Sequence, residues 1–133
     1  MISTYLKKKI HDQMIGGVAF TMPTTLYVAM SKTAPVADGT NVSEPTGANY
    51  ARVAVLNNKT NFTNCDDNGS IKNKTKITFA ESSGNWGKLT HYAIYDSLTD
   101  GNMLFANQLQ VERDIAIDMQ LFIDINGLEF TLN

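Results

Sequence analysis

Residues 86–109, WGKLTHYAIYDSLTDGNMLFANQL, contain two apolar runs, Leu89–Tyr95 and Met103–Leu109, with a polar segment between them. Runs of about seven aromatic and aliphatic residues joined by turn-forming residues such as Asp100 and Gly101 predict an antiparallel hairpin. Because side chains alternate between the two faces of a strand, the first run presents bulky residues on both faces. Such a strand is usually central in its sheet, so we expect this hairpin at the centre of an all-β domain.

Further strand patterns lie on both sides of this hairpin. The clearest is Ile115–Ile125, where six apolar side chains at odd-numbered positions alternate without a break with other residues. This alternation predicts one long strand with a buried face. Asn126-Gly127 then predicts a hairpin turn, although a β-bulge there would also account for the change of parity that follows. Shorter runs predict strands at residues 24–30, 50–56, 75–79 and 128–132.

The N-terminal residues Thr4–Ile15 have the pattern of an amphipathic helix. A hydroxyl at Ser3 or Thr4 can cap its first turn, and Gly16-Gly17 ends it because glycine readily takes the left-handed conformation. One apolar stripe recurs at a spacing of four residues. It is too narrow to be buried on all sides and too apolar to lie free in water, so we expect it to pack on the end of the β-domain or against a neighbouring subunit. The stripe consists of Leu6, Ile10 and Met14.

These patterns together predict an all-β fold: an antiparallel β-sandwich, immunoglobulin-like or jelly-roll, of about eight strands with one N-terminal helix. Residues 1–17 are predicted to form the helix and a Gly-Gly hinge, and residues 18–133 a single β-sandwich domain. Strict alternation would place Leu89 and Tyr92 on opposite faces of their strand. The large side chains that we expect in the core are Tyr27, Trp86, Tyr92, Ile94 and Phe105.

Composition excludes several classes of protein. With 133 residues, of which 43% are hydrophobic and 18% charged, the chain can form one domain with a substantial core. Its net charge of −2 shows no bias towards nucleic acid or acidic membranes, and no apolar run approaches the roughly 18 residues of a membrane span. Cys65 is the only cysteine, which fits folding in a reducing cytoplasm. We therefore expect no nucleic-acid partner, no membrane partner and no secretory signal.

Residue types that carry catalysis or bind metals are sparse. The two histidines, His11 and His91, lie in different predicted elements, and Cys65 has no histidine near it in the sequence. Residues 64–69, NCDDNG, match the first half of a calcium loop, but its twelfth position is Thr75 instead of a glutamate. We interpret this segment as a tight turn, and we expect no catalytic residue, no metal and no cofactor.

Three side chains on the predicted strands allow both a structural and a binding interpretation. Trp86 and Tyr92 are expected to anchor the core, and their alternative role is a platform on which a carbohydrate stacks. Arg52 is expected to pair with a carboxylate, either Glu44 or Asp96, as a structural tie.

Two segments, TLYVAMSKTAP at residues 25–35 and EPTGANYARVAV at residues 44–55, resemble those of a family of small bacteriophage virion proteins. Members of this family are commonly labelled phage tail-fibre or head-decoration proteins. The most specific motifs are Tyr50-Ala51-Arg52 and His91–Asp96, and the resemblance spans nearly the whole chain. Other segments that share it are residues 77–79, 86–87, 101–105 and 127–132, together with the opening helix.

This resemblance implies a non-catalytic virion protein that docks in multiple copies on the capsid, as a decoration or cement protein, or on the tail, as a fibre or adaptor. Its expected partners are other virion proteins and further copies of itself, with a host receptor as a further option. The alternative function is a receptor- or glycan-binding module of a tail fibre, for which the loops offer Tyr50 and Phe62. Phe122, surrounded by polar residues in the sequence, is expected to be a surface residue or a contact point. The expected partner-binding residues are Leu6, Ile10, Met14 and Phe122.

Overall fold

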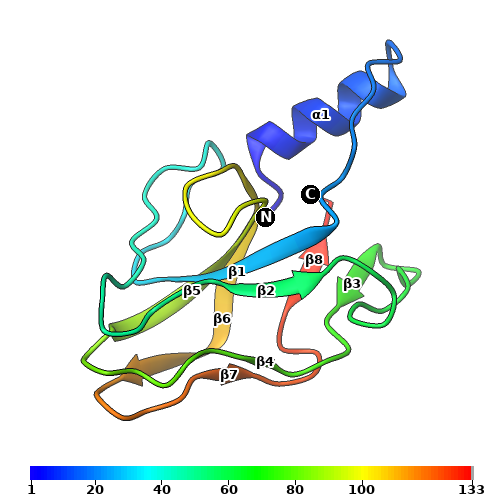
Figure 1. Ribbon diagram of the computed structural model, residues 1–133. Coiled ribbons are helices and arrows are strands. Elements are labelled where there is room, and N and C mark those ends of the chain that lie inside the picture. Colours follow the sequence, from blue (N-terminus) through cyan, green and yellow to red (C-terminus); the bar gives the residue numbers. More distant parts are fainter. Residues whose placement is uncertain (133) are drawn as a thin grey trace.

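The computed structural model describes residues 1–132 and shows an antiparallel β-sandwich with one N-terminal helix (Figure 1). One layer is a four-stranded sheet with the order β2-β1-β5-β6. The predicted central hairpin is confirmed, because β5 lies between β1 and β6 and Ile94 stands opposite Phe105. The prediction of about eight strands and one helix is also confirmed. The four strands are β1 (Thr25–Ser31), β2 (Val53–Leu56), β5 (Gly87–Tyr95) and β6 (Met103–Ile115).

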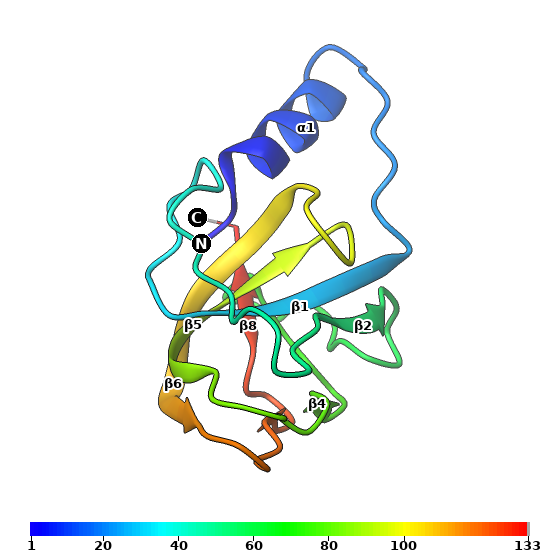
Figure 2. The same cartoon turned by 60° about the vertical axis from the view of Figure 1, so that its left-hand side comes forward.

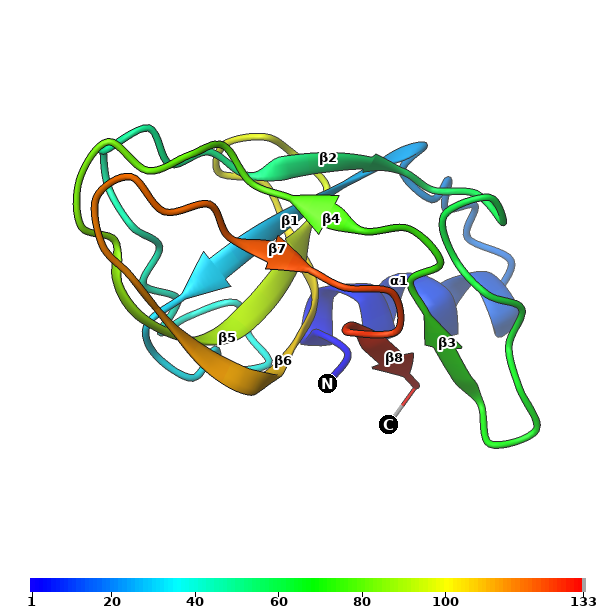
Figure 3. The ribbon, with the colours of Figure 1, turned by 90° about the horizontal axis from the view of Figure 1, so that it is seen from below.

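The second layer consists of two short strand pairs. β3 (Ser70–Lys72) pairs with β8 (Glu129–Thr131), and β4 (Ile77–Thr78) pairs with β7 (Phe122–Ile123). Seen from below, the β4–β7 pair lies in front of the four-stranded sheet and the β3–β8 pair lies to its side (Figure 3). The main core fills the space between the layers, and each large side chain buried there contributes about 1.5–3 kcal/mol. Its most buried members are Val28, Met30, Phe79, Leu89, Tyr92, Ile94 and Leu128.

Strand β5 departs from simple alternation at Leu89. The register between β5 and β6 shifts between Leu89 and His91, which marks a β-bulge. The bulge turns Leu89 inward, so that it joins Tyr92 in the main core. The prediction that these two residues lie on opposite faces is therefore wrong. Ala93 and Tyr95 belong to a second, smaller cluster with residues of β1 and β6.

The predicted strand Ile115–Ile125 is wrong. β6 ends at the first of these residues, and the chain then turns at Asp118, whose φ of 61° interrupts extended pairing. Buried Ser82 holds this turn, because its hydroxyl donates to the carbonyl of Ala116 and accepts from the N–H of Met119. An alternating sequence therefore does not form one strand here, since its middle section pairs with a serine instead of with a neighbouring strand. The large apolar residues of this range that are exposed are Ile117, Met119, Phe122 and Ile125.

Asn126-Gly127 forms a turn, but the turn does not join a hairpin. The N–H of Gly127 donates to the carbonyl of Asp124 (3.0 Å), and Asn126 has a φ of 65°. The strands on either side, β7 and β8, pair with β4 and β3 and not with each other. The hairpin prediction is wrong because the two strands diverge into separate halves of the second layer.

Helix α1 spans Thr4–Met14 and lies at one end of the sandwich, away from the β4–β7 pair (Figure 2). The predicted helix is confirmed apart from Ile15, which is extended, and Ser3 caps the first turn by accepting from the N–H of Leu6 (3.1 Å). Residues 1–3 run beside β6, where the N–H of Ser3 donates to the carbonyl of Leu104 (2.9 Å). No helix within residues 1–132 has the length and apolar character needed to cross a membrane.

Candidate interaction surface

The fold divides the apolar stripe of α1 into a covered part and an open part. Leu6 is 1% exposed and packs with Ile2 and Leu104, because the first three residues run along β6. Ile10 is half-buried, and Met14, at the end of the helix, is 72% exposed. The chain itself therefore covers Leu6 fully and Ile10 in part, and the last turn of the helix can contact another protein.

An open groove of about 420 Å³ lies beneath the helix. Its walls are mostly apolar and come from α1, from β1, β3, β5, β6 and β8, and from the loop after β2, with Leu26, Phe62 and Phe130 among them. A second hollow of about 230 Å³ borders Ile10 and Met14 on the other side of the helix. Leu132 borders both spaces. We call this surface the helix end, and its exposed apolar residues are Met14, Ile15, Val18, Met22 and Leu132.

A second exposed apolar surface surrounds Phe122. This side chain is 41% exposed, and the ammonium of Lys76 lies 3.8 Å from the centroid of its ring. A cation over an aromatic face is attracted by the ring quadrupole, so the contact stabilises this arrangement of the two side chains. Phe122 therefore lies on the surface and not in the core. We call this surface the turn end, and its exposed apolar residues are Val111, Ile117, Met119, Phe122 and Ile125.

The five aromatic and aliphatic residues expected in the core differ in burial. Trp86, Tyr92 and Ile94 are at most 2% exposed and belong to the main core. Tyr27 is half-buried because it packs on the second cluster, at the outer face of the sheet. Phe105 is half-buried because its ring borders the groove beneath α1.

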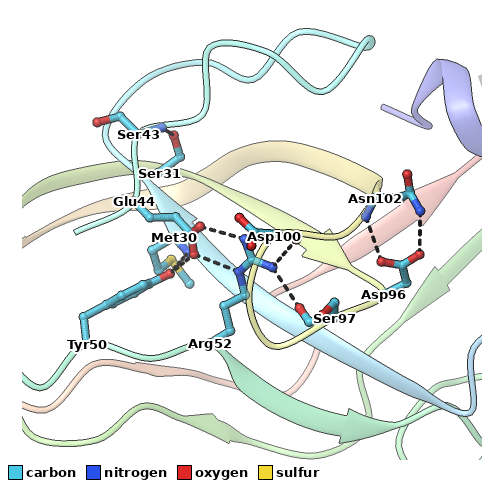
Figure 4. A network of polar contacts seen from close by, with 10 residues as sticks. All are labelled: Met30, Ser31, Ser43, Glu44, Tyr50, Arg52, Asp96, Ser97, Asp100 and Asn102. Atoms are coloured by element: carbon cyan, nitrogen blue, oxygen red, sulfur yellow. Dashed lines mark hydrogen bonds and ion pairs between the residues drawn. The ribbon is translucent and has the colours of Figure 1, made fainter. Parts of the chain in front are cut away.

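A buried polar network joins two loops near the start of β2 (Figure 4). The guanidinium of Arg52 donates to both carboxylate oxygens of Glu44, from Nε (3.0 Å) and Nη2 (2.8 Å). Its Nη1 donates to the carbonyls of Ser97 and Asp100, each at 2.8 Å. The guanidinium also lies 3.7 Å from the ring centroid of Tyr95. Arg52 thereby ties the loop before β2 to the loop between β5 and β6.

Of the two carboxylates predicted to pair with Arg52, the one that does so is Glu44. The other candidate, Asp96, instead accepts from the backbone N–H of Asn102 (2.7 Å). The hydroxyl of Tyr50 donates to Glu44 (2.7 Å) and accepts from the N–H of Met30. Burial by itself lowers the pKa of Arg52, but its hydrogen bonds to Glu44 and the charge of Glu44 outweigh burial and raise it. The polar atoms of this network form hydrogen bonds with other groups of the same chain, as expected for a structural role.

Alkaline pH is expected to destabilise the fold. Burial raises the pKa of Tyr50, Tyr92 and Tyr95 above the ordinary value of 10.0, because the charged phenolate is poorly solvated inside the protein. The unfolded chain therefore loses these protons first, and the stability present below pH 10 is lost as the pH rises towards the folded-state pKa values. Urea midpoints measured across this range should fall above pH about 10. A constant midpoint would show that these hydroxyls ionise freely in the folded protein.

The residues considered for catalysis or metal binding are not brought together. His11 lies on the exposed face of α1, and Nδ1 of His91 is hydrogen-bonded to the hydroxyl of Thr90 (2.8 Å). Cys65 is exposed in a loop. Within residues 1–132, no three or more His, Cys, Asp and Glu side chains are grouped so as to hold a metal ion.

Calcium is expected to leave the melting temperature unchanged. In residues 64–69 one carboxylate oxygen of Asp66 accepts from the N–H groups of Asn68 and Ser70, each at 2.9 Å. That oxygen closes a turn, and the segment supplies few charged ligands for a cation. Thermal melts with calcium and with chelator should agree within about 5 °C, which corresponds to roughly 1 kcal/mol for a domain of this size. A larger shift would show that the loop binds calcium.

Comparison with known protein families agrees with the resemblance to phage virion proteins. A family model described as podophage GP4 fiber I protein gp80 matches residues 1–131, nearly the whole chain. The chain belongs to this family. Membership in the gp80 family makes it a phage fibre structural protein and indicates association with other components of the virion. No match to the chain was found among the curated proteins.

The two motifs that carry the resemblance meet in this gp80-family chain. Arg52 of the first motif contacts residues in and after the second, because its guanidinium lies over Tyr95 and donates to the carbonyl of Ser97. No pattern in the sequence predicts the role of two other residues that hold distant segments together, Ser82 and Asn73, which are polar and buried. Each resembles an ordinary loop residue in the sequence, and its role depends on backbone groups about 35 to 55 residues away.

Proposed function

We propose that this chain is a non-catalytic structural subunit of the phage fibre, held to a neighbouring virion protein through its helix end. The observation that carries this proposal is the open apolar groove of about 420 Å³ beneath α1, bordered by an exposed apolar helix terminus. Contiguous exposed apolar surface is costly in water, and on soluble proteins it commonly marks a contact with another protein. Family membership supplies the class of neighbour, which is another fibre or virion component.

The helix end is rigid enough to serve as a docking surface. Ser3 caps α1 and pairs with β6, and Leu6 is fully packed, so the base of the helix is fixed on the sandwich. A partner that covers Met14 would thus bind a preformed surface and would pay little to order it. The fibre is favoured over a position on the capsid because the matching family is described as a fibre protein.

A structural role is favoured over receptor or glycan binding. The loop aromatics considered for a carbohydrate platform are Tyr50 and Phe62, and both pack inside the sandwich: Tyr50 against Phe79 and Trp86, and Phe62 against Phe130. Stacking on a sugar needs an open aromatic face. Tyr50 is half-buried and Phe62 is 7% exposed, so neither ring offers such a face to a sugar.

The test is a substitution at the exposed end of the helix. Met14→Asp should leave the melting temperature within about 2 °C of the native value, because an exposed position contributes little to folding. In phage particles grown with this variant, the number of copies per particle, measured by quantitative mass spectrometry, should fall at least about tenfold. Gln13→Asp, on the same turn, is the matched control and should incorporate normally. Normal incorporation of Met14→Asp would reject the helix end as the docking surface.

A substitution tests this surface more cleanly than removal of residues 1–17. Ile2 and Leu6 cover Leu104, so the shortened chain would expose part of the third core cluster. Loss of incorporation could then result from instability alone. The exposed position of Met14 avoids this ambiguity.

A further inference from the structure

The helix end and the turn end lie on opposite sides of the molecule. In Figures 1 and 2, α1 is at the top and the segment from the end of β6 to β7 is at the bottom. Seen from below, β7 is in front and α1 is behind (Figure 3). One molecule can therefore contact two neighbours at once, one through each end.

The two ends differ in shape. The helix end is hollow, with the groove and the adjoining hollow on either side of Ile10. At the turn end the chain projects, since every residue from Ala116 to Gln120 is exposed. This turn is fixed by Ser82, which is 2% exposed and whose carbonyl accepts from the N–H of Asp118 (2.9 Å). This rigid turn carries Ile117, which is 58% exposed, and Met119, which is 42% exposed and whose sulfur accepts from the N–H of Ala116.

The two ends also differ in charge. On α1 the exposed cations Lys7, Lys8 and Lys9 outnumber the one carboxylate, Asp12. Lys59 borders the groove, and Lys7 borders the adjoining hollow. At the turn end, the exposed carboxylates outnumber the cations in the segment from residue 111 to residue 126, where Arg113 is the single cation. Lys88 pairs with one of these carboxylates, and Lys76 covers Phe122. The carboxylates of this segment are Glu112, Asp114, Asp118 and Asp124.

We propose that the turn end of one copy seats in the helix end of the next, with Ile117 and Met119 entering the apolar groove and Asp118 facing Lys59 at its rim. The occupant is a second copy of this chain, because the two surfaces are complementary in both shape and charge. Two helix ends would bring lysines together, and like charges across an interface are repulsive. This inference rests on the proposed function, since it names the neighbour that covers the helix end.

A contact between two different surfaces of the same chain is heterologous, and when its rotation does not close a ring it extends into a filament. Such an arrangement repeats one contact along a fibre. The groove has the volume of cavities that receive ligands of moderate size, so it can accept two aliphatic side chains.

The test uses two variants, each with one end blocked. Leu132→Asp blocks the helix end, and Ile117→Asp blocks the turn end; the two side chains are 71% and 58% exposed, so each variant should fold. In sedimentation velocity over a range of concentrations, the native protein should form species larger than the monomer. Each variant alone should associate at least about tenfold more weakly. Val36→Asp, an exposed apolar residue outside both ends, is the matched control and should associate like the native protein.

The decisive sample is the equimolar mixture of the two blocked variants. It should form a dimer and nothing larger, because one intact helix end and one intact turn end remain to meet. A mixture that stays monomeric overturns the head-to-tail contact, as does a native protein that is monomeric at every concentration. Either result would leave the proposed function standing if Met14→Asp still reduced incorporation into particles, so the two failures can be distinguished.

Discussion

Replacing Arg52 with methionine is expected to lower the free energy of unfolding by about 3 kcal/mol, because removing one partner of a buried ion pair leaves the other charge uncompensated. The side chain of Arg52 is 7% exposed and that of Glu44 is 23% exposed, so solvent can screen the remaining carboxylate only in part. The carbonyls of Ser97 and Asp100 would lose their donor as well. Urea unfolding of the purified protein measures this change.

Arg113→Met is the matched control for this experiment. Arg113 is exposed near the end of β6, and exposed substitutions usually change stability by less than about 0.5 kcal/mol. Equal effects of the two substitutions would contradict the view that Arg52 ties the two loops together. Such a result would also mean that the contact of Arg52 with Tyr95 and Ser97, which joins the two family motifs, does not stabilise the fold.

Asn73→Ala is expected to cost a similar amount, about 3 kcal/mol, because it leaves buried backbone groups unpaired. Asn73 is 0% exposed, and its amide donates to the carbonyls of Thr75 and Asp124, each at 2.9 Å. Its side-chain oxygen accepts from the N–H of Leu128 (2.9 Å). The residue therefore fixes the turn between β7 and β8 to the segment between β3 and β4. Chemical denaturation should give a lower midpoint, while the slope of the transition is unchanged.

Asn68→Ala provides the comparison, since Asn68 lies exposed in the turn of residues 66–69. Its substitution should shift the stability by no more than about 0.5 kcal/mol. If Asn73→Ala were as mild as Asn68→Ala, the three hydrogen bonds of Asn73 would contribute little. The C-terminal strand β8 would then be held by its pairing with β3 and by the apolar packing of Leu128.

The hairpin of β5 and β6 could be predicted from the sequence because its signal is local. Two apolar runs and a turn lie within about 20 residues, and the bulky faces of the first run indicate a central strand. The pairing of Arg52 with a carboxylate was predictable for a related reason: a charge within a strand needs a partner. Arg52 pairs with Glu44 and not with Asp96 because Asp96 accepts a hydrogen bond from the backbone N–H of Asn102 in the folded chain.

The prediction of one long strand over Ile115–Ile125 is wrong because alternation shows which side chains can share a face but not whether a partner strand is present. Ser82, more than 30 residues earlier, forms hydrogen bonds with the backbone of Ala116 and Met119 and stabilises a turn there instead of a strand. The bulge at Leu89 likewise depends on the length of β6 opposite it. Such features arise from pairing between distant segments, which a single sequence does not specify.

The candidate site was predicted only in part for the same reason. The stripe of α1 is visible in the sequence, and so is an aromatic at Phe122 among polar residues. The groove, in contrast, is assembled from residues that are far apart in the chain, such as Leu26, Phe62 and Phe130. The exposure of Ile117 and Met119 follows from the turn that Ser82 holds.

A cryo-electron density map of the phage particle, resolved to the level of secondary structure, would show whether the helix end is a docking surface. We expect copies of this sandwich to lie in the fibre and protein density of a neighbouring subunit to cover the last turn of α1, at Met14. Copies placed outside the fibre, or a helix end that faces solvent in every copy, would contradict this expectation.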